Sequence, residues 1–347
     1  MTRVSSIVFM AEPQKNSFDL LRLFAAALVL YSHQHVLLGL AEPELFGWTT
    51  LGGVGVSIFF FLSGFLVWSS WARDPDFVRF FIRRSLRIFP ALWFVVLFTA
   101  MVLGPLLSKL PVSDFFASSE TWRYISTALL LVRRGLPGVF LDNPYPLAVN
   151  GSLWTLPVEF LCYVSVALIG GIGLVSRNGL MALSLGMAVV AAAYGALLLG
   201  PRFVSHLEMV AFFWWGVMYG FVRERPASEY KLWAVGIGVA FVAFGVLGSR
   251  GIERTGTLVL AAVLVMVAQR VSWGSRVTAR LGDLSYGMYI YAFPVQQMLV
   301  QLGRSRGWTF SMHLSLSLLV TGVLAYVSWH ALEKRVLRFK PQRKVFA

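Results

Sequence analysis

The chain has 347 residues, of which 57% are hydrophobic and only 13% are charged, and its mean hydropathy is +0.71. This composition excludes an ordinary soluble domain, and the long apolar runs differ from the roughly 10-residue alternating segments of a transmembrane β-barrel. The net charge of +14 does not indicate nucleic-acid binding, because the basic residues are scattered between apolar runs, where they suit anionic lipid headgroups. We therefore expect an all-α polytopic membrane protein.

The apolar runs predict about ten transmembrane helices, each of roughly 20 residues. The expected spans are 18–38, 54–72, 88–108, 152–171, 180–199, 206–222, 232–248, 256–270, 284–302 and 312–332. A single membrane domain, residues 1–347, accounts for the chain, and a basic tail, 333–347, follows the last span. Most lysines and arginines between the spans face the cytoplasm if both termini lie there, so the positive-inside rule favours that orientation.

The first predicted span, within FDLLRLFAAALVLYSHQHVLLGL, contains Asp19, Arg22, His33 and His35. Arg22 and His33 are eleven residues apart, which is about three helical turns plus ~20°, so they share one stripe and lie about 16 Å apart along the axis. His35 lies about 200° from that stripe, and Asp19 is one turn before Arg22, where it can pair with it. Such a stripe marks a functional cavity or, alternatively, polar packing between helices.

The segment FVRFFIRRSLRIFPALW, residues 77–93, gathers arginines just before the third predicted span, on the expected cytoplasmic side. Arg83 and Arg87 are one turn apart, and Arg84 is adjacent to Arg83. Guanidinium groups bind phosphates through paired hydrogen bonds, so the cluster predicts a polyphosphate site, with an ordinary positive-inside loop as the alternative. Pro90 is expected near the start of the helix, where proline is tolerated.

The longest connection, 109–151, contains TWRYISTALLLVRR. This stretch is too short to span a bilayer and too apolar for a free loop. We expect it either to lie in the membrane interface or to re-enter the protein.

Glu159 follows the sequence NGSLWTLPV inside the fourth predicted span. A carboxylate within a membrane needs a cationic or hydrogen-bonding partner, or it is protonated. Arg22, an arginine of the 79–87 cluster, or His33 are the candidate partners. The lone cysteine, Cys162, excludes a disulfide framework and a thiol-rich metal site, and we expect no metal.

The segment LGDLSYGMYIYAFPVQQ, residues 281–297, begins the ninth predicted helix. Asp283 is in position to cap this helix, and Pro294 is expected to break it. We interpret both as architectural.

Taken together, ordered motifs spread over most of the chain resemble the acyltransferase 3 family, whose members are membrane-embedded O-acyltransferases that modify bacterial surface and secreted glycans. The motifs are FDLLR with the R-x10-H spacing, GVGVSIFFFLSGFLV, RRSLRIFPALW, SLWTLPVEF and LGDLSYGMYIYAFP. The family has a ten-helix architecture, which agrees with the number of spans expected here. The resemblance implies a location in the bacterial inner membrane, no permanently bound cofactor, an acyl-CoA donor, usually acetyl-CoA, and a sugar hydroxyl, free or on a lipid-linked precursor, as acceptor.

The family's functional positions correspond to residues of this chain. The resemblance assigns catalytic positions to His33, Arg22 and Glu159, and it places the R-x-x-R pair for the donor at Arg84 and Arg87; with the adjacent Arg83 these form the expected coenzyme A site. His33 is the expected base, because an imidazole can take a proton from a hydroxyl near neutral pH. Many members also have a histidine within the stretch where this chain reads Tyr291, Ala292 and Phe293.

Two other classes remain open at this stage. Intramembrane Arg, His and Glu also suit a proton-coupled small-molecule transporter, although no paired repeat halves are evident. A family member that binds glycans or partner enzymes without catalysis is the third alternative.

Overall fold

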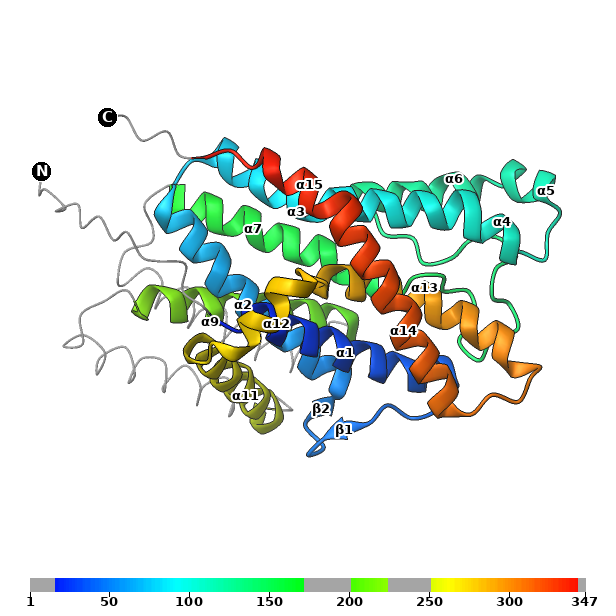
Figure 1. The fold of residues 1–347 in the computed structure, drawn as a ribbon, viewed down its shortest axis with the longest axis horizontal. Coiled ribbons are helices and arrows are strands. Elements are labelled where there is room, and N and C mark those ends of the chain that lie inside the picture. Colours follow the sequence, from blue (N-terminus) through cyan, green and yellow to red (C-terminus); the bar gives the residue numbers. More distant parts are fainter. Residues whose placement is uncertain (1–15, 172–200, 224–250, 343–347) are drawn as a thin grey trace, which may run out of the picture.

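The computed structural model describes residues 16–171, 201–223 and 251–342. Within these ranges the fold is helical apart from one antiparallel hairpin, β1 (Glu44–Leu45) and β2 (Thr49–Thr50). The long helices are α1 (Phe18–Leu37), α2 (Leu51–Arg73), α3 (Phe77–Phe98), α7 (Thr155–Gly171), α9 (Pro201–Arg223), α11 (Gly251–Arg270), α13 (Ser285–Arg304) and α14 (Phe310–Ser328). The short helices are α4 (Gly104–Leu107), α5 (Val112–Ala117), α6 (Ser119–Ile125), α12 (Trp273–Leu281) and α15 (Lys334–Val336). Most of the long helices run side by side as a bundle (Figure 1).

The all-α membrane class is confirmed. Five helical segments in the described part of the chain are long and apolar enough to cross a membrane, and a sixth results if α11 and α12, which are bent by 83°, form one span. Helices coincide with eight of the ten expected spans. Two of these eight helices, α9 and α13, are not among the segments that are apolar enough to cross a membrane. The expected spans 180–199 and 232–248 lie outside the described residues.

Helices α2 and α9 pack closely against each other through two glycines. A Cβ atom on Gly64 would lie 1.9 Å from the carbonyl oxygen of Phe213, and one on Gly216 would lie 1.9 Å from that of Phe61. Glycine at both positions therefore lets the two backbones touch, as small residues do between membrane helices. This contact holds α2, which forms one side of both cavities described below.

A buried polar network joins α1, α13 and α14. Gln296 Nε2 donates to the carbonyl of Leu30 at 2.9 Å and to Gln34 Oε1 at 3.0 Å. Ser317 Oγ donates to the same Gln34 oxygen at 3.0 Å. Because a buried amide without partners is costly, this network fixes the register of the three helices.

The start of α3 corrects the expected helix boundary. The helix begins at Phe77, where the Asp76 side chain caps it by accepting from the backbone N–H of Arg79 at 2.8 Å, and not near residue 88. The arginine cluster therefore lies inside the helix, and Pro90 is in the helix interior.

Pro294 does not break the ninth predicted helix, because α13 continues through it to Arg304. A proline cannot donate the hydrogen bond to the carbonyl four residues earlier, which here belongs to Ile290. Asn150 Nδ2 donates to that carbonyl at 2.9 Å and replaces the missing bond.

The apolar stretch in the 109–151 connection folds back along α3, and its position relative to the membrane stays a prediction. Trp93 Nε1 of α3 donates to the carbonyl of Ala128 at 2.9 Å. Trp93 precedes the end of α4 at Leu107 by fourteen residues, about 20 Å of helix. The chain turns at Leu130, whose φ is 65°, and α6 lies beside α3 in Figure 1.

Candidate active site

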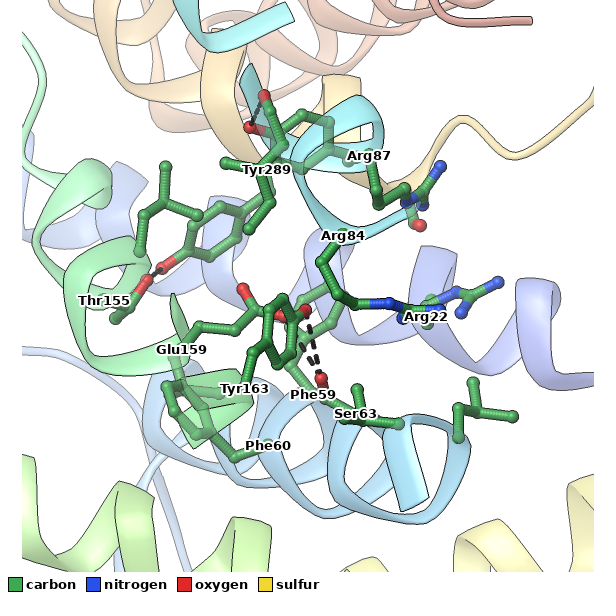
Figure 2. A pocket seen from close by; sticks show the side chains of 17 residues that line it. Arg22, Phe59, Phe60, Ser63, Arg84, Arg87, Thr155, Glu159, Tyr163 and Tyr289 are labelled. Atoms are coloured by element: carbon green, nitrogen blue, oxygen red, sulfur yellow. Dashed lines mark hydrogen bonds between the residues drawn. The ribbon is translucent and has the colours of Figure 1, made fainter. Parts of the chain in front are cut away.

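A cavity of about 110 Å³ opens between α1, α2, α3, α7 and α13. Arg22, Arg84 and Arg87 line it together with Glu159. Figure 2 shows Arg22 and Arg87 on one side of this space and Thr155 and Glu159 on the other. Phe59 and other apolar side chains complete the lining. We call this space the arginine cavity. Residues from all five of the predicted motifs therefore meet at one place.

Asp283 holds two of the arginines. Its Oδ2 lies 2.6 Å from Arg87 Nη2 and 3.1 Å from Arg22 Nη2, while its Oδ1 accepts from Ser285 Oγ at 2.5 Å. Burial alone would raise the pKa of Asp283, but the charges of Arg22 and Arg87 outweigh it and hold this pKa well below its usual range. Arg22 also pairs with Asp19, as the helical spacing predicts. Asp283 thus keeps two cations side by side in the cavity lining.

Arg84 is bound differently. Its Nη2 donates a long hydrogen bond of 3.4 Å to Ser70 Oγ, and its guanidinium lies 5.8 Å from the ring centre of Tyr163 and 5.9 Å from that of Phe80. Among the described residues no carboxylate lies within ion-pair distance of Arg84, and its Nε is buried without a hydrogen-bond partner. Its charge is therefore available to an anionic ligand.

Arg83 does not line the arginine cavity. Its Nη1 lies 2.7 Å from Asp74 Oδ2, and Arg79 Nη2 lies 2.7 Å from Asp74 Oδ1. Hydrogen bonds from Arg79 and Arg83 hold the pKa of Asp74 below its usual range even though burial raises it. The structure thus brings Arg84 and Arg87 into the cavity and commits Arg83 to the connection between α2 and α3.

Glu159 is held by hydroxyl groups. Its Oε1 accepts from the hydroxyl of Tyr163 and from Ser63 Oγ at 3.2 Å, as the dashed lines in Figure 2 show. Among the described residues it forms no ion pair. The expected pairing of Glu159 with an arginine or with His33 is therefore not found, and Arg22 has Asp19 and Asp283 as its partners.

His33 lines a second cavity, of about 270 Å³, formed by α1, α2, the β1–β2 hairpin, the Ser152–Trp154 turn, α9 and α13. We call it the histidine cavity. The His33 Nδ1 atom is buried and has no hydrogen-bond partner in the described part of the chain, and the ring packs edge-on against Phe293 at 5.3 Å. His35 faces other neighbours, since its ring lies 4.5 Å from that of Phe310. The two histidines therefore point in different directions, as their spacing predicts.

The two cavities share a wall. Val56 and Tyr289 line both of them. The Tyr289 hydroxyl lies 2.7 Å from Thr155 Oγ1 and donates to the carbonyl of Ser152 at 3.0 Å, and its ring lies 5.6 Å from that of Phe59. Arg22 and His33, on one helix stripe, consequently face two adjacent spaces separated by two side chains.

Sequence reasoning missed the roles of Asp283 and Tyr289 in this site. Asp283 was interpreted as a helix cap, and it does accept from the Ser285 backbone N–H at 3.3 Å, but its second oxygen holds the arginines. An intramembrane arginine needs an acidic partner, which makes every acidic residue beside a predicted span a candidate, but nothing in the local sequence singles out Asp283. Tyr289 carries no comparable signal, because a tyrosine in an aromatic helix is ordinary core.

Comparisons with known proteins add independent information. Residues 15–330 match the family model described as an acyltransferase domain, of the acyltransferase 3 type. The chain is 32% identical to an O-acetyl transferase of Shigella phage Sf6, over 93% of this chain and 96% of that protein. It is 27% identical to Nodulation protein 10 of Rhizobium leguminosarum bv. viciae over 94% of each chain. It is 28% identical to the exopolysaccharide production protein ExoZ of Rhizobium meliloti, over 86% of this chain and 93% of that protein. No solved structure matches the chain.

Proposed function

The chain belongs to the acyltransferase 3 family and is a membrane O-acyltransferase, and on this premise we propose that it moves an acetyl group from acetyl-CoA to a hydroxyl of a cell-surface or secreted glycan, or of its lipid-linked precursor. Membership of an enzyme family decides against the transporter alternative. The observation that carries the proposal is the pair of adjacent cavities, one lined by arginines and one by His33, with Val56 and Tyr289 between them.

The arginine cavity is the proposed donor site. Coenzyme A carries a diphosphate and a further phosphate, and Arg22, Arg84 and Arg87 offer cations in a largely apolar setting. At about 110 Å³, the cavity is smaller than the roughly 300–1,000 Å³ of a pocket for a whole drug-sized ligand. We therefore expect the acyl end of the pantetheine arm to fill it, with the phosphates at its arginine side.

The histidine cavity is the proposed acceptor site. A sugar hydroxyl is a poor nucleophile until a base takes its proton, and an imidazole nitrogen of His33 is in position to do so. The hydroxyl oxygen then bonds to the thioester carbonyl carbon, the carbon–sulfur bond breaks, and the coenzyme A thiolate leaves and takes up a proton. That is the direct route. In the route through an acyl-enzyme, an enzyme nucleophile first bonds to the carbonyl carbon and releases the coenzyme A thiolate, and the sugar hydroxyl then bonds to the same carbon and displaces the enzyme nucleophile.

The roles of the remaining site residues follow from their contacts. Asp283 positions Arg22 and Arg87, and Glu159 lines the donor site, where its carboxyl oxygen accepts from the hydroxyls of Ser63 and Tyr163. The arginines lie near the ends of α2 and α3 that the positive-inside rule assigns to the cytoplasm. We therefore propose that the donor enters from the cytoplasm and that the acceptor enters from the opposite side.

The test is acetyl transfer by the purified protein from radiolabelled acetyl-CoA to a panel of glycosides, with His33→Ala and His35→Ala compared. We expect His33→Ala to reduce transfer by at least about 100-fold, the lower range for loss of a general base, and His35→Ala to retain most activity because it faces Phe310. Equal activity losses in two well-folded variants would contradict the assignment of His33, and no transfer by the wild type to any glycoside would contradict the proposed function.

A further inference from the structure

We propose that the histidine cavity binds an uncharged sugar ring of the acceptor and that its acidic lining rejects sugars that carry a carboxylate or a phosphate. This inference rests on the proposed function and adds to it the chemical class of the acceptor. It is carried by the charges, the hydrogen-bonding groups and the aromatic ring that surround His33.

The two cavities are opposite in charge. The charged residues that line the histidine cavity, among the described residues, are Glu42 and Glu208, whereas three arginines line the neighbouring space. Arg254 lies 2.5 Å from Glu208 Oε1 and balances that carboxylate without lining the cavity itself. Glu42 has no such cation among the described residues.

An anionic sugar in this cavity would bring a further negative charge against Glu42 in a setting of low dielectric, where like charges repel strongly. A neutral sugar meets no such repulsion, because its hydroxyl groups can donate to the carboxylates. An ionised carboxylate offers about four acceptor positions. Glu42 uses one of them, since its Oε1 accepts from Ser32 Oγ at 2.6 Å.

Further polar groups and one indole ring suit a sugar ring. Thr49 and Thr50 line the cavity from the hairpin, and Ser57 lines it from α2. Trp154 also lines the cavity, and its ring is held edge-on against His206 at 5.1 Å. Aromatic side chains offer a large apolar face with a polar handle. A sugar ring, which has hydroxyls at its edge and C–H groups on its faces, is complementary to this mixture.

The position of the cavity links recognition to the reaction. Trp154 ends the turn whose Ser152 carbonyl accepts the Tyr289 hydroxyl, and Tyr289 belongs to the wall shared with the donor site. A ring bound in this cavity therefore lies in the same space as His33 and beside the wall shared with the donor site. Glu42 would therefore repel an anionic ring in the space that the ring must occupy to bring its hydroxyl to His33.

The test uses acceptor pairs that differ only at C6, where the neutral member has a hydroxymethyl group and the anionic member a carboxylate, such as p-nitrophenyl β-glucoside with the corresponding glucuronide and the galactoside with the galacturonide. The purified protein is given radiolabelled acetyl-CoA, and kcat/KM is measured for each acceptor. We expect the neutral member of an accepted pair to be preferred by roughly tenfold or more, the effect of an uncompensated charge contact.

Glu42→Gln and Trp154→Ala then test the named residues. We expect Glu42→Gln to narrow the preference for the neutral member and Trp154→Ala to raise the acceptor KM, with coenzyme A affinity unchanged in both. The matched control is Glu44→Gln, since Glu44 is exposed on β1, two residues from Glu42, and does not line the cavity; it should behave as the wild type.

The outcomes separate this inference from the proposed function. Equal transfer to neutral and anionic acceptors by the wild type, or an unchanged preference in a folded Glu42→Gln variant, would overturn the neutral-sugar site while leaving the acetyltransferase intact. No transfer to any glycoside, with acetyl-CoA bound normally, would overturn the proposed function and the inference with it.

Discussion

Replacing Asp283 by asparagine should destabilise the protein in a way that coenzyme A repairs. The side chain of Asp283 is 10% exposed, and those of Arg22 and Arg87 are 23% and 21% exposed. Removing one partner from a buried ion pair costs about 3–5 kcal/mol, and from an exposed pair about 0–1 kcal/mol. At these exposures we expect a loss of about 2–3 kcal/mol, which corresponds to a Tm lower by roughly 5 °C for a chain of this size.

In the proposed donor site, coenzyme A would bring its phosphates to the same arginines and offset their mutual repulsion. The assay is thermal unfolding in detergent with and without saturating coenzyme A, and we expect the ligand-induced rise in Tm to be larger in Asp283→Asn than in the wild type. Asp19→Asn is the matched control, because Asp19 also pairs with Arg22 but is 43% exposed; its loss should stay below about 1 kcal/mol. A lower Tm with no larger response to coenzyme A would refute the idea that phosphates occupy these arginines.

Two further predictions concern the donor site. Arg84→Ala should weaken coenzyme A binding roughly tenfold or more, as expected for the loss of a charge-assisted hydrogen bond. Arg83→Ala is the control and should leave the affinity unchanged, because Arg83 is held by Asp74. Equal coenzyme A affinities of the two variants in calorimetry would contradict this. Glu159→Gln should keep a Tm within a few degrees of the wild type, because hydroxyl donors and, among the described residues, no ion pair hold this carboxyl group. The variant should nevertheless lose most acetyl transfer. A loss of Tm in parallel with the loss of transfer would make the role of Glu159 structural.

The helices could be predicted because apolar length is a local property. The run from Phe18 to Leu37 is a helix of nearly the expected bounds, and the spacing of Arg22 and His33 correctly placed them on related faces. The start of α3 was predicted too late, because a stretch with an arginine every few residues has low hydropathy even though Phe80, for example, is fully buried. Periodicity, and not average hydropathy, is the signal that extends this helix to Phe77.

The pairings in the site could not be predicted in the same way. Arg87 and Asp283 are 196 residues apart and Arg22 and Asp283 are 261 residues apart, so no local pattern selects Asp283 over Glu159 as the partner of these arginines. The shared wall of Val56 and Tyr289 likewise depends on how α2 and α13 pack. A sequence indicates which polar groups need a partner inside a membrane, whereas tertiary packing decides which partner they obtain.

The central claim is that donor and acceptor reach the shared wall from opposite sides of the membrane. It is tested most directly in sealed proteoliposomes, with acetyl-CoA and a membrane-impermeant acceptor glycoside placed in chosen compartments. With acetyl-CoA outside and the acceptor inside, product should form from the molecules whose cytoplasmic face points outward. With both substrates only outside, product should be absent, whichever way the protein is inserted. Detergent should restore transfer in every arrangement. Product formed with both substrates on the same side of an intact membrane would contradict the account.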